Sequence, residues 1–225
     1  MVAAAKKLRL VPAEDFFKSS QTGAKGLNSP ELDHEPQSLS QALPAGRLVE
    51  LSGQGAVARS SVAVSLLLEA QAQGESCAWI QLADGGLYVP DLTTAGVDLD
   101  SLIVLQIPRR AGTPALLRSA ELLLRSGAFG MLVVDLEGQR PTGSPSAWQG
   151  RLLGLARQHE SRVVFLSRAD RERGSLGPLI GLRVEARRHR LARGRFSIEG
   201  DVLKNKSGAP FCFPTLAMRG PWGLR

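Results

Sequence analysis

Cysteine, histidine and aromatic residues are scarce in this sequence. Its two cysteines, Cys77 and Cys212, are too few for a disulfide framework and suit a reducing compartment. No apolar run approaches the ~18 residues that a membrane-spanning helix requires. The basic residues that follow Met1 do not lead into an apolar stretch, so we expect no secretory signal. These absences predict a soluble protein of the cytoplasm.

The few histidines also limit the chemistry that the chain can offer. His34 lies in a polar segment, His159 at the end of a predicted helix and His189 among arginines, so each is interpreted as a surface residue. No pair of nucleophile and base is apparent, and no spacing of His and Cys indicates a metal site. The sequence therefore predicts neither a catalytic residue nor a bound metal.

Positive charge is in excess, and it is unevenly placed. The net charge is +7, and residues 168–225 alone hold 13 basic and 5 acidic residues. Most of these cations are arginine, whose planar guanidinium binds phosphates and carboxylates. Such a block indicates nucleic acid or an acidic protein surface as a partner, but a solvated face that keeps the protein soluble fits the charge equally well.

Composition divides the chain into an arm over residues 1–45, a core over 46–211 and a tail over 212–225. Ser, Gln, Gly and Pro dominate the arm, and Phe16 and Phe17 are its main apolar surface, able to dock on the chain's own core or on a neighbour. Hydrophobic residues make up 43% of the chain, which excludes wholesale disorder.

The core alternates short apolar runs with amphipathic segments. Predicted strands cover residues 48–51, 77–82, 102–107, 131–136 and 163–166, and predicted helices cover residues 60–73, 113–127 and 146–159. Apolar strands separated by helices are typical of a parallel sheet that is covered on both faces. The predicted fold class is therefore α/β, a mostly parallel sheet flanked by helices.

After the last of these strands the pattern changes. Leu182 and Val184 alternate with Arg183 and Glu185, and a second alternation follows Gly194, which predicts a C-terminal antiparallel hairpin with Arg and Glu on its outer face. The tail shows no periodicity. We expect contacts with a partner or with DNA from charged residues of the hairpin and large apolar residues of the tail. These are Arg183, Arg187, Arg188, Arg190, Arg193, Arg195, Lys204, Lys206, Phe213, Met218 and Trp222.

The turn after the first predicted strand is the candidate nucleotide site. The phosphate-loop pattern G-x-x-x-x-G-K-[ST] is kept at its first and last positions, whereas Ala58 and Arg59 replace the second glycine and the lysine. Asp135 ends a buried strand, where a carboxylate would orient magnesium. The remnant of the site consists of Gly53, Gln54, Gly55, Ala58, Arg59, Ser60 and Asp135. With half of the pattern kept, ATP and magnesium are neither predicted nor excluded.

The same turn fits two other patterns. Gly53, Gly55 and Ala58 match G-x-G-x-x-G/A, the pattern of a dinucleotide site, and a glycine turn can also serve only to let a helix pack on a strand. Ala83 stands where an ATPase places the glutamate that activates water, with the shorter Asp84 beside it. Catalysis is therefore not expected from this edge of the sheet.

Four stretches resemble the RecA recombinase, in the same order along the chain. They are LPAGRLVELS (43–52), GVDLDSLIVLQ (96–106), LLRSGAFGMLVVD (123–135) and VLKNKSGAPF (202–211). The resemblance covers residues 43–211 and implies a RecA-like core of the P-loop type. The segments that correspond to RecA's DNA-binding loops, about 137–146 and 169–177, are short, which implies that RecA's grip on single-stranded DNA is lost.

A degenerate phosphate loop, the stretch WIQLADGGLYVPDL (79–92) and a basic C-terminal part resemble the ImuA family of the bacterial SOS mutagenesis cassette. The resemblance implies a non-catalytic accessory factor of translesion synthesis that gathers at the nucleoid when DNA is damaged. It implies three partners, namely RecA, whose filaments the protein would limit, ImuB and through ImuB the translesion polymerase. The alternatives are an active DNA-stimulated ATPase, an NAD-type enzyme and a SulA-like division inhibitor.

Overall fold

The computed structural model describes residues 39, 43, 45–55, 57–208 and 212–219. The strands are β1 (Arg47–Ser52), β2 (Cys77–Leu82), β3 (Leu102–Ile107), β4 (Met131–Asp135), β5 (Arg162–Leu166), β6 (Leu182–Ala192), β7 (Arg195–Asn205) and β8 (Leu216–Arg219). The helices are α3 (Arg59–Ala72), α4 (Val89–Ala95), α5 (Gly112–Ser126) and α6 (Pro145–Gln158), with a 3-10 turn, η1, at Arg109–Ala111.

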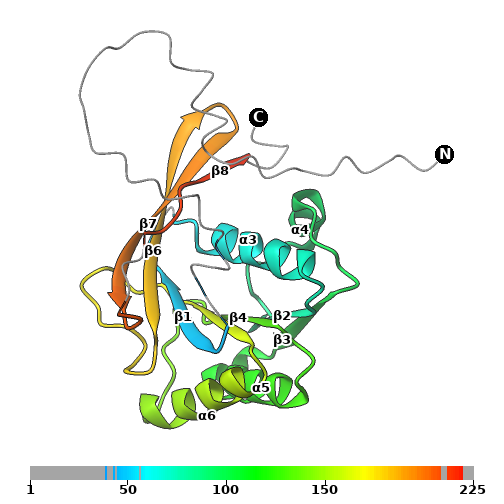
Figure 1. Ribbon diagram of the computed structural model, residues 1–225, viewed down its shortest axis with the longest axis vertical. Helices are drawn as coiled ribbons and strands as arrows, with labels where there is room; N and C mark the ends of the chain where they lie inside the picture. The colour runs from blue at the N-terminus through cyan, green and yellow to red at the C-terminus, as the bar shows by residue number, and fades with distance from the viewer. Residues whose placement is uncertain (1–38, 40–42, 44, 56, 209–211, 220–225) are drawn as a thin grey trace, which may run out of the picture.

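All the strands join one sheet in the order β3-β2-β4-β5-β1-β6-β7-β8. The strands from β3 to β6 run parallel, and β7 and β8 add to them antiparallel. Helices α3 and α4 cover one face of the sheet, α5 and α6 cover the other, and the β6–β7 hairpin extends beyond the helices (Figure 1). The predicted α/β class, the parallel sheet and the C-terminal hairpin are confirmed.

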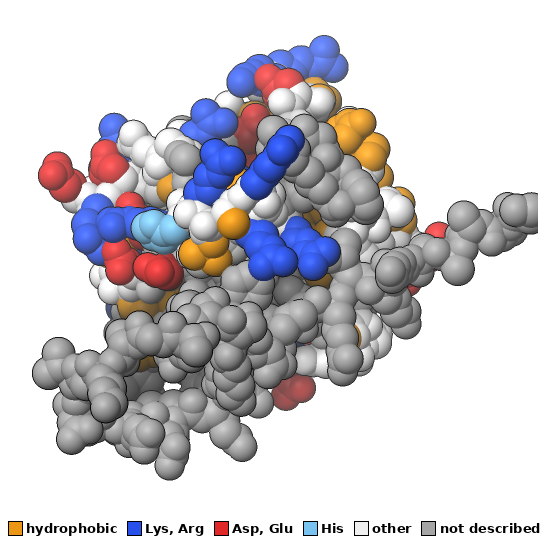
Figure 2. All heavy atoms as spheres, turned by 90° about the horizontal axis from the view of Figure 1, so that it is seen from above, with side chains coloured by type: hydrophobic (Ala, Val, Ile, Leu, Met, Phe, Trp, Pro, Cys, Tyr) orange, Lys and Arg blue, Asp and Glu red, His pale blue; other side chains and the backbone are white. Residues whose placement is uncertain are grey.

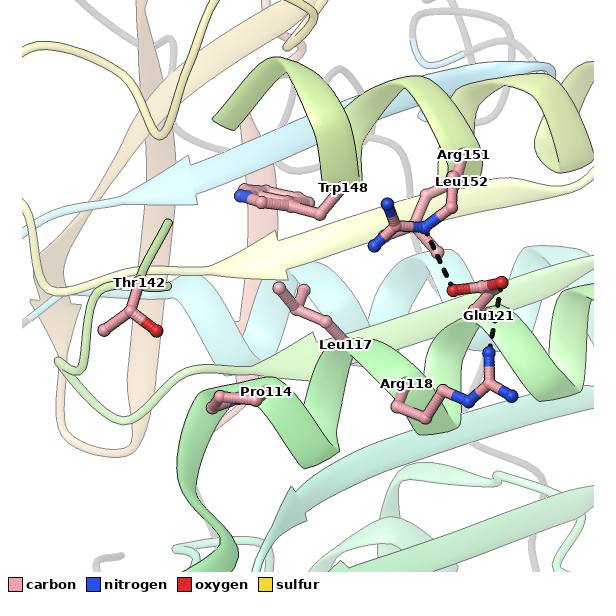
Figure 3. A pocket seen from close by; sticks show the side chains of 8 residues that line it. All are labelled: Pro114, Leu117, Arg118, Glu121, Thr142, Trp148, Arg151 and Leu152. Carbon is pink, nitrogen blue, oxygen red and sulfur yellow. Dashed lines mark hydrogen bonds and ion pairs between the residues drawn. The ribbon is translucent and has the colours of Figure 1, made fainter. Parts of the chain in front are cut away.

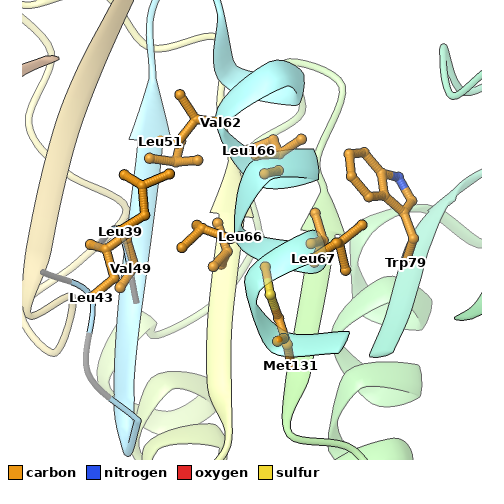
Figure 4. Packing of buried hydrophobic residues seen from close by; sticks show 14 of the residues in the cluster. Leu39, Leu43, Val49, Leu51, Val62, Leu66, Leu67, Trp79, Met131 and Leu166 are labelled. Atoms are coloured by element: carbon orange, nitrogen blue, oxygen red, sulfur yellow. The ribbon is translucent and has the colours of Figure 1, made fainter. Parts of the chain in front are cut away.

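Two hydrophobic clusters explain why the sequences of the parallel strands are continuous runs of apolar residues. On one face, Val62, Leu66 and Leu67 of α3 pack against β1, β4 and β5 (Figure 4). On the other face, Leu116 and Trp148 bring α5 and α6 onto the same strands. Since both sides of each central strand are covered, neither side carries the polar residues that would show an alternation.

Besides the 3-10 turn η1, the structure adds a helix and a strand to the elements predicted from the sequence. Helix α4 follows β2, with Pro90 in its first turn and Gly96 closing it at a φ of 96°. In the tail, β8 pairs with β7 over Leu216–Arg219. In the described part of the chain, no helix is both long and apolar enough to cross a membrane. Phe16, Phe17 and Trp222 lie outside the described residues.

Candidate functional site

The loop between β1 and α3 is closed by β6. Gly53 and Gly55 turn the chain with φ values of 139° and 72°, which glycine adopts readily. Val57 then forms an isolated antiparallel bridge with Arg187, and the backbone N–H of Ala58 donates to the carbonyl oxygen of Ala186 over 3.1 Å. The N–H of Val57 donates to the carbonyl oxygen of Gly55 over 2.9 Å. Two loop amides are therefore bonded to the protein's own carbonyl groups.

The side chain of Val57 fills the inside of this turn. A Cβ atom placed on Gly53 would lie 2.6 Å from Cγ1 of Val57 and 3.6 Å from Cγ of Glu185. A phosphate site in a glycine-rich loop needs free backbone amides around an open cradle. In the described part of this loop, the side chain of Val57 occupies the inside of the turn at Gly53, and the amide of Ala58 is bonded to β6.

Arg59 and Asp135 lie at the carboxyl edge of the sheet, and each charge influences the pKa of the other residue. Burial lowers the pKa of Arg59, and the charge of Asp135 opposes that shift. Burial likewise raises the pKa of Asp135, while the N–H of Glu137, at 2.9 Å from Oδ1, and the charge of Arg59 lower it. Nη1 of Arg59 is buried without a hydrogen-bond partner. The arginine that stands in place of the pattern's lysine is therefore half-buried and is electrostatically coupled to Asp135.

The remaining residues of this edge form its rim. Ser60, the second residue of α3, is exposed, and Nε2 of Gln54 donates to Asp170 over 3.3 Å. Asp84, beside the position where an ATPase places its glutamate, accepts a hydrogen bond at Oδ2 from Nε of Arg109 over 2.9 Å in an exposed ion pair. Among the described residues of this edge, Gln54 and Asp84 are therefore both engaged by neighbouring side chains.

The pKa of Glu137 at this edge of the sheet predicts how the stability of the fold changes with pH. Burial and the charges of Asp135 and Asp84 raise its pKa. A carboxyl group whose pKa is higher in the folded chain stabilises the fold fully only below its unfolded pKa of about 4.3, and this contribution is lost as the pH rises through the folded pKa. Glu137→Gln removes that loss, so we expect the variant to gain stability over wild type as the pH rises from about 4 to 7.

Urea unfolding of both proteins at intervals of one pH unit measures this difference. Glu172→Gln, at an exposed position of the β5–β6 connection, is the matched control and should show a flat difference. A Glu137→Gln advantage that grows toward acid pH would contradict the assignment.

The segment that joins β5 to β6 is held in place by hydrogen bonds from several parts of the chain. Glu50, buried in the middle of β1 with 0% exposure, accepts hydrogen bonds from Ser167 Oγ at 2.7 Å and from the N–H of Leu176 at 2.9 Å. Arg140 donates to the carbonyl oxygens of residues 174 and 175. The sequence predicted a short loop here, and the structure shows a loop whose backbone is held by interior side chains. Sequence reasoning missed Glu50, although a carboxylate within the apolar run LVELS was a signal.

Three of the predicted contact residues serve this same segment. The expectation that Arg183 lies on the outer face of the hairpin is wrong, because it is 3% exposed and donates to Ser52 Oγ and to the carbonyl oxygens of residues 170 and 173. Lys204 donates to Ser175 Oγ and to the carbonyl oxygen of residue 177, and Lys206 to that of residue 178. These three cations therefore fix a loop.

Of the other hairpin arginines, two contact neighbouring side chains of the hairpin. Arg187 is tied to Glu185 at 2.8 Å and to Asp201 at 3.4 Å, and these partners raise its pKa. Arg188 lies over the ring of Phe196, with Cζ 4.8 Å from the ring centroid.

Arg190, Arg193 and Arg195 are exposed at the far end of the hairpin. Seen from that end, Lys and Arg side chains gather on one face, with acidic side chains at its margin (Figure 2). The described hairpin therefore presents a compact basic end, while Arg187 near its base is paired.

Two of the predicted tail residues contact the hairpin. The ring of Phe213 packs on Gly200, where the space left by the missing side chain admits it. Met218 lies opposite Phe196 in the β7–β8 pair and is half-buried. This part of the tail folds back onto the core.

Comparisons with known proteins agree with this architecture. The family described as the RecA N-terminal domain matches residues 29–139. RecA of Cutibacterium acnes is 41% identical over 93 residues, which are 41% of this chain and 26% of that protein. RecA of Blastochloris viridis is 30% identical over 210 residues, which cover 75% of this chain and 58% of that protein. The chain thus spans between about a quarter and three-fifths of the length of these relatives.

A solved structure extends the likeness beyond the matched sequence. The crystal structure of the RadB recombinase superimposes with a TM-score of 0.58, covering 81% of this chain and 93% of RadB. At 16% identity, this likeness concerns the fold alone. Together with the partial sequence matches to RecA, this likeness of fold supports a relationship to the RecA-like superfamily.

Proposed function

We propose that this chain is a RecA-like protein without ATPase activity that acts by binding other proteins. Its suggested role is that of an accessory factor in SOS-induced translesion synthesis, as the resemblance to the ImuA family implies. It would bind RecA and limit its filaments, and it would contact ImuB and through it the translesion polymerase. In this role the protein works in the cytoplasm and at the damaged nucleoid.

The observation that supports the proposal is the closed loop. Val57 fills the turn at Gly53, and the N–H of Ala58 is bonded to β6. A core that keeps the RecA-like sheet while filling the nucleotide cradle retains surfaces for docking but has no room for the phosphates that drive a cycle of hydrolysis. The proposal assigns the function to those surfaces.

Nucleotide binding is the first measurement that separates the candidates. A ligand present at a hundred times its dissociation constant stabilises a protein by about 2.7 kcal/mol, which shifts the thermal midpoint measurably. We expect neither ATP with magnesium nor NAD to move the midpoint, because Val57 fills the turn at Gly53 and the amides of Val57 and Ala58 have internal partners. RecA under the same conditions is the positive control. Hydrolysis stimulated by DNA would restore the active ATPase, and stabilisation by NAD would restore the dinucleotide enzyme.

The filament assay tests the proposed activity directly. RecA is polymerised on single-stranded DNA with increasing amounts of this protein, and filament length and strand exchange are followed. We expect both to fall as the protein approaches the RecA concentration, because a docked chain that cannot bind ATP cannot support the next protomer. Unchanged filaments at excess protein would contradict the proposal. Capture of ImuB on the same immobilised protein tests the second partner independently.

A further inference from the structure

A groove between α5 and α6 is not used by any part of the proposed function. It has a volume of about 410 Å³. Pro114, Leu117 and Leu152 give it apolar walls, and Thr142 and Trp148 lie toward one end (Figure 3). It lies on the face of the sheet opposite α3, remote from the closed loop.

The rim of the groove carries a surplus of positive charge. Glu121, only 5% exposed, is surrounded by three arginines at distances of 2.7–3.3 Å, namely Arg118, Arg125 and Arg151. Each of these guanidinium groups has more than half of its side chain exposed. One carboxylate cannot satisfy three guanidinium groups, so N–H donors remain directed to the rim. The groove suits a ligand that combines carboxylates with apolar side chains.

Trp148 provides an independent sign of a missing partner. Trp148 is 5% exposed, and its indole Nε1 is buried without a hydrogen-bond acceptor. The ring stands edge-on to Phe165, with centroids 5.4 Å apart, which holds it in place. The nitrogen lies at the end of the ring nearer Thr142 (Figure 3). Buried indole N–H groups usually have an acceptor, so a carbonyl or carboxylate oxygen of an occupant would complete this wall.

The chain itself contains one segment of matching chemistry. Glu14 and Asp15 directly precede Phe16 and Phe17, and nowhere else in the sequence is an acidic residue followed by an aromatic one. Two carboxylates suit the arginines of the rim, and two phenyl rings suit the apolar walls.

We propose that residues 14–17 of the arm occupy the α5–α6 groove of the same chain. Leu39, the first described residue, is anchored in the core on the α3 face. The 22 residues from there to Phe17 span up to ~75 Å when extended. A folded domain of this length has a radius of gyration of about 17 Å, so the arm reaches round the edge of the sheet. Covalent attachment raises the effective concentration of the segment, which favours its own groove over that of a second copy.

Disulfide trapping in the full-length chain tests this placement. On a Cys212→Ser background, Lys18→Cys beside the two phenylalanines is combined with Thr142→Cys on the groove wall. The matched control combines Lys18→Cys with Thr94→Cys, which is exposed on α4 on the opposite face. Under mild oxidation, we expect the intramolecular disulfide to form at least about tenfold faster at Thr142 than at Thr94.

Two arm variants then separate specific docking from random collision. Phe16→Ala with Phe17→Ala, and separately Glu14→Gln with Asp15→Gln, should reduce the rate at Thr142 to that of the control while leaving the folded core unchanged. Equal rates at the two positions, or rates that the arm variants do not change, would overturn the proposal. Disulfide-linked dimers that increase with protein concentration would also overturn it, because they place the arm on a second copy.

Discussion

Replacing Arg183 by alanine is expected to lower the free energy of unfolding by about 3–5 kcal/mol, the usual cost of removing one partner from a buried ion pair. The guanidinium of Arg183 lies 3.8 Å from the carboxylate of Glu50, and both side chains are buried. Without this cation, the buried carboxylate of Glu50 has hydrogen bonds, among the described residues, only from Ser167 and from the N–H of Leu176. The carbonyl oxygens of Asp170 and Arg173 also lose their donor.

Urea denaturation measures this loss, and Arg190→Ala provides the matched control. Arg190 lies on the same strand but is exposed, so its replacement should change the free energy of unfolding by no more than about 0.5 kcal/mol. If Arg183→Ala does not fold, Glu50→Gln, which keeps most of the hydrogen-bonding geometry, should show a smaller loss that can be measured. Equal effects of Arg183→Ala and Arg190→Ala would show that the buried pair does not hold the β5–β6 connection.

The misplacement of Arg183 shows what a sequence pattern cannot resolve. Arg183 and Glu185 alternate with apolar residues, which is typical of a strand with one solvated face. In the structure, however, the first part of β6 lies between β1 and β7 and its polar side is covered by the β5–β6 connection. The strand becomes a projecting hairpin only beyond Ala186. Alternation reveals which residues share a face, and the neighbours that cover that face come from distant parts of the chain.

The position of the candidate site could be predicted from the sequence, but the hydrogen bond that closes its loop could not. The order of strands and helices placed the loop at residues 53–60 and Asp135 at the carboxyl edge of the sheet, because continuous apolar runs mark parallel strands. The replacements at Ala58 and Arg59 were visible in the sequence. The bond from Ala58 to Ala186 was not, since it joins residues 128 positions apart. The short strand β8 was missed for a related reason, because four residues between prolines and glycines carry no period that identifies a strand.

If the basic end of the hairpin contacts single-stranded DNA, as its charge suggests, replacing both Arg188 and Arg190 by glutamine is expected to weaken that binding and to reduce its dependence on salt. Both residues are exposed and lie two positions apart on β6 toward the basic end of the hairpin, where Phe196 supports the guanidinium of Arg188. Each phosphate contact contributes about 0.7 to the slope of log affinity against log salt. Losing two contacts should lower the slope by about 1.4 and the affinity at low salt by about 10–100-fold.

Fluorescence anisotropy with a labelled oligonucleotide, titrated at several salt concentrations, measures both quantities. Arg110→Gln with Arg157→Gln removes the same charge from exposed positions outside the hairpin and is the matched control. The control should leave the slope nearly unchanged, because those arginines do not belong to the basic end. If both double variants lower affinity equally, net charge governs binding and the hairpin is not the contact surface. If wild type shows no salt dependence, the basic end makes no phosphate contact, since release of counterions is the mark of such a contact.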